Sequence, residues 1–238
     1  MKLLALDTAT EACSAALLLG TELRTRFEVL GRGHAERLLP MVDELLGESG
    51  LALGCLDAIA FGRGPGAFTG LRIAVSVAQG LALGSGLPVV PISDLAALAL
   101  QALDRAAREA AGGTGPGAAL VCLDARMSEV YWSLARRRAD GSLELEPERL
   151  GAPGDVAIAG EEPLIGAGHG FAAYPSLRER FGKRLVACWP EMLPRAEEVA
   201  RLAVFELRAG RSSRPEDVQP LYLRNDVATR SSRPAGAA

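Results

Sequence analysis

Apolar and polar positions repeat with two different periods over the first fifty residues. Apolar runs at 3–6 and 13–19, and a roughly alternating run at 23–30, predict three strands. The short Gly20-Thr21 link favours an antiparallel meander. From residue 35 to 46 the apolar spacing becomes helical and Gly47 supplies a stop. Pro40 inside this pattern predicts a kink or a later start of the helix.

The same alternation of strand and helix continues up to residue 112. Residues 56–61 predict a strand that runs into a glycine-rich turn, and Thr69 opens a helix that reaches about residue 83. A short strand at 88–90 follows, and Ser93 caps a long alanine-rich helix that ends at Gly112. The predicted order is β-β-β-α-β-α up to the helix that Thr69 opens.

The second half repeats this theme loosely, without a close sequence repeat. We expect strands at 119–123 and 129–136, a turn at 139–142, a third short strand, a strand at 163–165 and a helix at 195–207. Residues 112–117 contain four glycines and no bulky apolar side chain, which makes them the best linker. We therefore predict an N-terminal lobe at 1–112, a C-terminal lobe at 113–228 and a disordered tail at 229–238.

Composition narrows the class of protein. With 238 residues, 49% of them hydrophobic, the chain can bury a large core. A net charge of -3 argues against a surface that grips phosphate backbones by itself. The four cysteines lie far apart in no metal-binding pair, which is typical of buried thiols in a reducing cytosol. The longest apolar tract, 71–90, is interrupted by Arg72 and Gln79, so we expect no membrane segment.

Asp7, Thr8 and Thr10 are the first candidates for chemistry. They follow the first strand, where a carboxylate and two hydroxyls can hold hydrated magnesium and a phosphate. A turn that satisfies its own backbone groups is the interpretation we favour. Residues 62–70 invite a similar comparison with phosphate-binding loops. They lack the Lys-Ser or Lys-Thr pair of a Walker loop and the GxGxxG spacing, so a structural turn is favoured again.

The two histidines and the second half of the chain add few candidate catalytic or binding residues. His34 and His169 are the only histidines, and Leu38 stands where an HxxxH metal site would need its second imidazole. Asp124, Arg126 and Glu129 follow a second-half strand, where they can contact a substrate or, as we prefer, join the lobes by ion pairs. Residues 166–170 are glycine or alanine except for His169, and they can either admit an adenosine or form a strand-to-helix turn. No GxSxG nucleophile motif occurs.

Several motifs resemble the TsaB (YeaZ) family. GRGPGAFTGLRI at 62–73, with AQGLA at 78–82, is similar to the family signature GRGPGSFTGLRIG with AQGLA after it. Ala67 replaces the usual serine and Ala74 the usual glycine. Weaker matches cover nearly the whole chain and are thinnest over 137–184; they are LALDTAT at 4–10, CSAA at 13–16, Gly33-His34, LLPMV at 38–42, SDLAALA at 93–99, DAR at 124–126, EVY at 129–131 and PLYLR at 220–224.

This resemblance implies a fold and a function. The implied fold class is α/β, a two-lobed actin- and hexokinase-like (ASKHA) fold with mixed sheets flanked by helices. The implied partners are the paralogous catalytic subunit TsaD, which transfers a threonylcarbamoyl group to a tRNA adenosine, and the ATPase TsaE. TsaB proteins lack the metal-binding histidine pair of TsaD, and Leu38 agrees with this. The family was formerly labelled a glycoprotease, but this sequence contains no metal-binding pair or activated nucleophile that would support such an activity.

We therefore expect a cytoplasmic, non-catalytic activator that contacts tRNA only within the complex. It should need no cofactor or metal of its own. The sequence does not decide whether ATP or ADP binds at the boundary with TsaD. Ala74, Ala78 and Ala82 lie on one stripe of a helix. The resemblance implies that this stripe binds TsaD, whereas the frequent burial of alanine favours packing in this chain's own core. The predicted partner residues are His34, Leu38, Leu45, Ala74, Ala78 and Ala82. The alternatives are a kinase or nucleotide hydrolase that uses Asp7 as a magnesium ligand, and a self-associating module that forms homodimers when alone.

Overall fold

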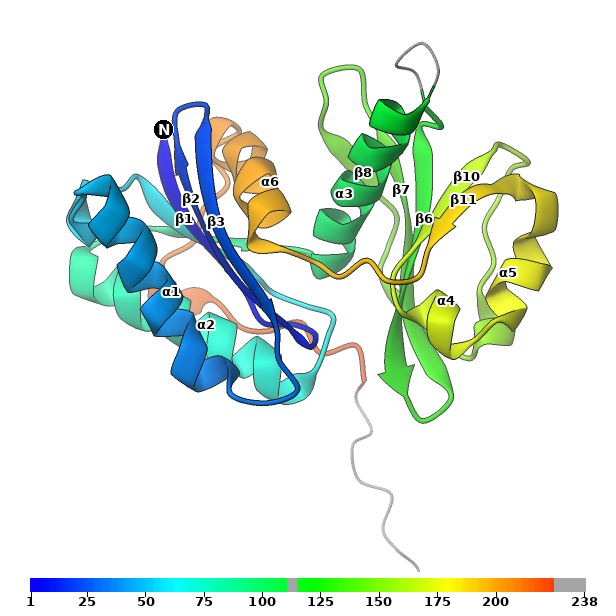
Figure 1. The fold of residues 1–238 in the computed structure, drawn as a ribbon, viewed down its shortest axis with the longest axis horizontal. Coiled ribbons are helices and arrows are strands. Elements are labelled where there is room, and N and C mark those ends of the chain that lie inside the picture. Colours follow the sequence, from blue (N-terminus) through cyan, green and yellow to red (C-terminus); the bar gives the residue numbers. More distant parts are fainter. Residues whose placement is uncertain (111–114, 225–238) are drawn as a thin grey trace, which may run out of the picture.

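The computed structural model describes residues 1–110 and 115–224. Two mixed sheets, each flanked by helices, form two lobes that lie side by side (Figure 1). The first lobe contains β1 (Lys2–Asp7), β2 (Ala12–Leu19), β3 (Glu22–Val29), α1 (His34–Ser49), η1 (Leu53–Cys55), β4 (Ala58–Gly62), α2 (Phe68–Ser85) and β5 (Val89–Ile92). The helix α3 (Asp94–Glu109) then leads into the second lobe.

The second lobe contains another set of strands and shorter helices. They are β6 (Ala118–Arg126), β7 (Glu129–Arg137), β8 (Leu143–Leu145), β9 (Arg149–Gly151), η2 (Pro153–Asp155), β10 (Leu164–Ala167), α4 (Gly170–Ala173), α5 (Ser176–Phe181), η3 (Gly182–Arg184) and β11 (Leu185–Trp189). Two further elements, α6 (Ala196–Arg208) and η4 (Pro215–Asp217), follow these along the chain.

The two sheets share one strand topology. The first has the order β3-β2-β1-β4-β5, in which β1, β2 and β3 are antiparallel neighbours and β4 and β5 run parallel to β1. The second has the order β8-β7-β6-β10-β11, with the same alternation of antiparallel and parallel pairs. The loose repeat seen in the sequence is therefore a repeat of strand order and direction. This arrangement confirms the predicted class of mixed sheets flanked by helices.

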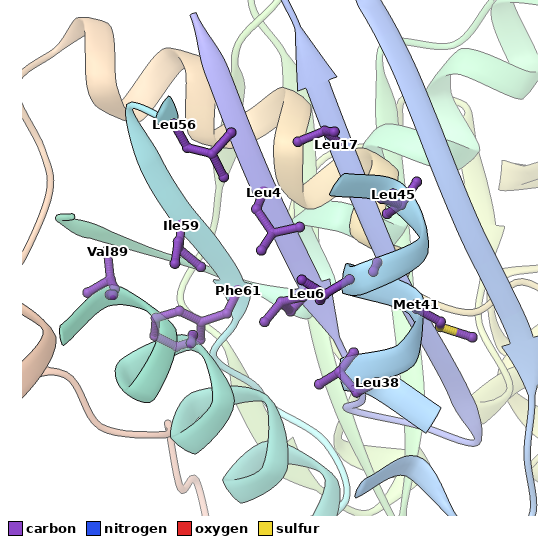
Figure 2. Close-up of a cluster of buried hydrophobic side chains, with 14 of the residues drawn as sticks. Leu4, Leu6, Leu17, Leu38, Met41, Leu45, Leu56, Ile59, Phe61 and Val89 are labelled. Carbon is purple, nitrogen blue, oxygen red and sulfur yellow. The ribbon is translucent and has the colours of Figure 1, made fainter. Parts of the chain in front are cut away.

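Apolar side chains cover both faces of the first sheet. On one face, leucines of β1 and β2 pack with α1, with Phe61 of β4 and with α2 (Figure 2). On the other face, Leu3, Ala5 and Ala60 pack against α6. Burying both faces explains why these strands read as nearly continuous apolar runs. The second sheet is covered by α3 on one face and by α4 and α5 on the other.

The helix α6 belongs to the first lobe by its packing, although it follows the second sheet along the chain. It contacts β1, β2, β4 and β5, and the amide of Ala196 at its start donates to the Ser14 hydroxyl of β2. Beyond α6, Ser213 pairs with Val89 at the edge of β5. Our division at 112/113 assigned these residues to the C-terminal lobe, because sequence order alone does not show that the chain returns.

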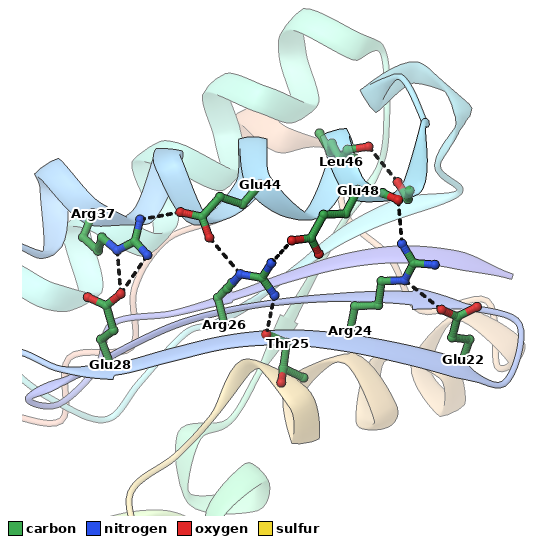
Figure 3. A network of polar contacts seen from close by, with 10 residues as sticks. Glu22, Arg24, Thr25, Arg26, Glu28, Arg37, Glu44, Leu46 and Glu48 are labelled. Carbon is green, nitrogen blue, oxygen red and sulfur yellow. Dashed lines mark hydrogen bonds and ion pairs between the residues drawn. The ribbon is translucent and has the colours of Figure 1, made fainter.

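Ion pairs cover the outer edge of the first sheet. Arg26 of β3 pairs with Glu44 of α1 at 2.8 Å, and Arg37 of α1 pairs with both Glu44 and Glu28 at 2.7 Å (Figure 3). Arg26 also pairs with Glu48. Exposed pairs of this kind contribute little stability each. Charged side chains on an edge strand do, however, oppose pairing with another chain.

Most predicted elements lie within a few residues of their observed bounds. Ser93 caps α3 as expected, because its hydroxyl accepts from the amide of Ala96. Of the two outcomes predicted for Pro40, the late start is wrong, since α1 begins at His34. The predicted tail at 229–238 lies outside the described residues, as does the first half of the predicted linker, 112–114. No helix among the described residues is long and apolar enough to cross a membrane.

Candidate functional site

A cleft of about 1060 Å³ lies between the lobes. The first lobe contributes the turn after β1, the start of α1 and the start of α2, and the second lobe contributes the end of β6 and the turn after β10. The polar side chains that line it include Thr10, Glu11, His34, Asp124, Arg126 and His169. The cleft thus brings together both histidines and two of the predicted second-lobe residues.

Asp7 and Thr8 do not face this cleft. Both are completely buried, and neither lines the cavity. Asp7 Oδ1 accepts from the amide of Ala9 at 2.9 Å, and the Thr8 hydroxyl donates to the carbonyl of Gly70 at 2.7 Å. Thr10 does line the cleft, where its hydroxyl accepts from the amide of Ala12 at 3.2 Å. The turn satisfies its own backbone groups in this way.

The glycine-rich loop 62–70 closes over that turn. The amide of Ala67 donates to the carbonyl of Ala9 at 2.7 Å. A Cβ atom added to Gly66 would overlap the backbone of Ala9, and one added to Gly70 would overlap the carbonyl oxygen of Thr8. The glycines therefore serve close backbone packing. The loop therefore packs directly against the turn that carries Asp7 and Thr8, and Gly62 lies next to the second oxygen of Asp7.

Asp94, which the sequence marked only as part of the family motif SDLAALA, is the buried neighbour of Asp7. Its Oδ2 accepts from the amide of Gly64, while its Oδ1 has no partner. The second oxygen of Asp7 also has no partner, and both of these oxygens lie beside the Cα of Gly62. Burial and the nearby Asp7 carboxylate raise the pKa of Asp94 well above its usual value, and burial also raises the pKa of Asp7.

One proton shared between these carboxyl groups would satisfy both oxygens, as in other close carboxyl pairs. This pair connects the turn after β1 to the start of α3, at a point where Gly62 leaves no side chain between them. A charge pattern in the sequence cannot reveal it, because Asp7 and Asp94 are separated by seven secondary-structure elements.

His169 faces Glu11 across the cleft. The amide of Asp124 donates to His169 Nδ1 at 2.8 Å, so the ring carries its hydrogen on Nε2. That Nε2 lies 3.7 Å from a Glu11 carboxylate oxygen. Burial disfavours the imidazolium and lowers the pKa of His169. The ring is therefore held as a neutral donor that points from the second lobe toward the first.

The other histidine and the small residues have structural contacts. His34 Nε2 donates to the carbonyl of Thr10 at 3.0 Å, which ties the start of α1 to the turn after β1. Residues 166–170 form the end of β10 and the turn into α4, where Gly168 and Gly170 press on the backbone of Cys122. Among the described residues, no cluster of three or more His, Cys, Asp or Glu side chains has the geometry to hold a metal ion.

Asp124, Arg126 and Glu129 lie around the turn between β6 and β7. Arg126, Met127 and Ser128 all have positive φ, a conformation that is unfavourable for residues with a side chain. Asp124 accepts from the Arg126 amide at 2.9 Å and from the Tyr174 hydroxyl at 3.1 Å. Arg224 donates to the Ala125 carbonyl at 3.2 Å and pairs with Glu129. In the sequence, Arg224 stood out only as the last residue of the family motif PLYLR, and Tyr174 belonged to no motif.

The predicted partner surface needs correction. Leu38, Leu45, Ala74, Ala78 and Ala82 are all completely buried, and four of them lie in the core of the first lobe. They pack against this chain's own sheet and helices, so they offer no surface to a partner. The spacing of the alanines was read correctly as one stripe, but helical periodicity does not distinguish a face that meets the core from one that meets another chain.

Comparisons with known proteins identify the family. The sequence profile described as "TsaD: tRNA N6-adenosine threonylcarbamoyltransferase" matches residues 28–159. The Escherichia coli protein named tRNA threonylcarbamoyladenosine biosynthesis protein TsaB is 37% identical over 232 residues, which cover 96% of each chain. The Haemophilus influenzae protein of the same name is 40% identical over 95% of each chain. The chain belongs to the TsaB family.

Solved structures agree with this assignment to TsaB. A structure titled YeaZ from Pseudomonas aeruginosa has a TM-score of 0.82 and 45% identity, and the match covers 93% of this chain and 99% of that one. A second Pseudomonas aeruginosa structure, described as similar to the peptidase YeaZ, has a TM-score of 0.83 and 44% identity over 94% and 99% of the two chains. The expected actin-like ASKHA fold of TsaB proteins is thereby confirmed.

Proposed function

We propose that this chain is a non-catalytic subunit of the machinery that makes threonylcarbamoyladenosine on tRNA, and that it activates the catalytic subunit TsaD by pairing with it. Membership of the TsaB family supports the pathway. The observation that carries the non-catalytic role is the closed turn after β1. Asp7 is completely buried beside the loop 62–70, where one oxygen of its carboxyl group accepts from a backbone amide and the other lies next to the Asp94 carboxyl group.

The main alternative is a kinase or nucleotide hydrolase that uses Asp7 to hold magnesium. Such an enzyme requires oxygens that water and phosphate can reach, because magnesium keeps several waters and binds substrate phosphates. Asp7 has no exposed surface, and the glycine loop lies over it. The closed turn therefore favours the subunit over the enzyme.

The exposed apolar residues of α1 and α2 replace the buried stripe as the proposed TsaD surface. The two helices lie side by side (Figure 1). Leu39 is 43% exposed, and further apolar side chains are only partly buried against the core; these are Leu46, Ile73, Val77 and Leu81. A surface of this kind suits a partner that presents its own apolar helices. The same face can pair with a second copy when TsaD is absent.

Reconstitution tests the function directly. TsaD, TsaE, threonylcarbamoyl-adenylate and tRNA are incubated with and without this chain, and the modified nucleoside is quantified by mass spectrometry. We expect product only when TsaD and this chain are both present, and none with this chain alone. Product formed by this chain alone, or Mg-ATP turnover that Asp7→Ala abolishes, would establish an enzyme instead.

Binding to TsaD tests the surface. We expect Leu39→Arg to weaken the complex more than tenfold, which corresponds to about 1.4 kcal/mol, because a charge in an apolar interface loses its hydration. Val186→Arg is the matched control, since Val186 is 55% exposed but lies on β11 in the second lobe. Equal affinity of both variants for TsaD in calorimetry would move the surface away from α1. An ATP or ADP site at the boundary with TsaD, and contact with TsaE, stay predictions.

A further inference from the structure

The segment 218–224 crosses from the first lobe to the second at the cleft. It begins on α2, where the Gln79 amide donates to the carbonyl of Val218 at 3.2 Å. The amide of Leu221 then donates to the carbonyl of Arg63 at 2.7 Å, beside the loop 62–70. Leu221, Tyr222 and Arg224 all line the cleft. The segment is thus fixed to the first lobe over its first half.

An aromatic contact on α2 completes this anchor. The rings of Tyr222 and Phe68 lie 5.2 Å apart, and the Arg72 guanidinium sits 3.8 Å above the Phe68 ring. Arg72 Nε also donates to the Tyr222 hydroxyl at 3.0 Å. Stacking and cation–π contact together fix the ring of Tyr222 at the first turn of α2.

The end of the segment is anchored in the second lobe. Arg224 is largely buried, and its guanidinium reaches the turn between β6 and β7 from the side of the first lobe. It donates to the carbonyl of Ala125, pairs with the Glu129 carboxylate and contacts Met127. A planar guanidinium can make several such contacts at once, which a lysine ammonium cannot reproduce.

Arg224 contacts a turn whose backbone is unfavourable for residues with side chains. Three consecutive residues with side chains have positive φ only in this turn, and such conformations persist where surrounding contacts hold them. Glu129 and Ala125 flank the three residues on either side. The Arg224 side chain therefore contacts the residues on both sides of the turn.

We propose that residues 218–224 form an interlobe strap, in which Arg224 holds the β6–β7 turn in its left-handed conformation and fixes the width of the cleft. The strap works together with Glu11 and His169, which face each other across the same cleft. It does not depend on the proposed role in tRNA modification, because every contact lies within this chain.

Hydrogen exchange measured by mass spectrometry tests the strap on the full-length protein. In Arg224→Ala we expect peptides spanning 125–130 to exchange at least tenfold faster, while peptides from β1 and β2 keep their rates. Arg224→Lys, which retains the charge but not the fork, should give an intermediate rate. Arg214→Ala is the control, because Arg214 is an exposed arginine near the same end of the chain whose ion pairs are with Glu216 and Asp217.

Distance measurements test the effect on the cleft. Spin labels are placed at the exposed Cys55 of the first lobe and at Val186→Cys in the second, with Cys188→Ser to prevent a third label. We expect a broader interlobe distance distribution in Arg224→Ala and an unchanged one in Arg214→Ala. Unchanged exchange at 125–130, exchange that rises equally in the first sheet, or an unchanged distance distribution in Arg224→Ala would each overturn the strap.

Discussion

A buried glutamate between α3 and α6 offers a sharp test of the packing. Glu198 is only 5% exposed, and its carboxylate lies 3.5 Å from the Gln101 amide nitrogen. Burial is the main cause that raises its pKa from 4.5 to about 7, with a smaller contribution from Glu197 and opposition from Arg201. The folded state therefore binds a proton more tightly than the unfolded state does.

The sign and size of the effect follow from this difference. A carboxyl with a raised pKa stabilises the folded state below pH 4.5, and that contribution is lost as the pH rises through 7. The change in pKa corresponds to about 3 kcal/mol between these limits. Glu198→Gln keeps the shape of the protonated side chain without a titrating group. We expect the variant to match the parent near pH 4.5 and to exceed its stability by up to about 3 kcal/mol at pH 8.

Urea unfolding at several pH values measures this difference, and groups common to both proteins cancel in it. Glu197→Gln is the control, because it also removes a negative charge from the first turn of α6, where the helix dipole favours carboxylates by roughly 0.3–1 kcal/mol. A Glu198→Gln difference that stays constant from pH 4.5 to 8 would show that this carboxyl is not held protonated by burial.

Substitutions at Asp94, Gly70 and Ala78 in the first lobe, with matched controls, test its packing by denaturant unfolding. Asp94→Ala leaves the second oxygen of Asp7 without a proton donor and should cost roughly 1–3 kcal/mol, whereas Asp94→Asn, whose amide can donate, should cost less than about 1 kcal/mol; equal costs would contradict the shared proton. Gly70→Ala should cost roughly 1–3 kcal/mol by overlap with Thr8, while Gly80→Ala on the same helix has free space and should stabilise by about 0.5–1 kcal/mol. Ala78→Arg should cost about 3–5 kcal/mol as an unpaired buried charge, and a variant of unchanged stability would return that position to the surface.

The sequence predicted what depends on local pattern. Strand and helix positions were accessible because apolar spacing and caps such as Ser93 act within a few residues. The glycine loop was correctly favoured as a structural turn, although its partner, the turn after β1, was not identified. Family resemblance, rather than periodicity, supplied the fold class.

Contacts between segments that are distant in the sequence could not be predicted from local patterns. Asp7 and Asp94 meet only because β1, β4 and β5 lie side by side and place their ends together. Arg224 lies 95 residues from Glu129 in the sequence. The alanine stripe had two possible neighbours, and only tertiary packing decides between them. Each of these cases needs the positions of elements that local patterns do not encode.

The return of α6 to the first sheet has a consequence for synthesis of the chain on the ribosome. When the first 110 residues have emerged, one face of β1, β4 and β5 still lacks the helix that covers it. The helix α6 covers this face only after the whole second sheet has been translated, because α6 spans Ala196–Arg208. The apolar face formed by Leu3, Ala5 and Ala60 therefore lacks this helix until α6 has been translated, and we expect the nascent chain to need a chaperone during that interval.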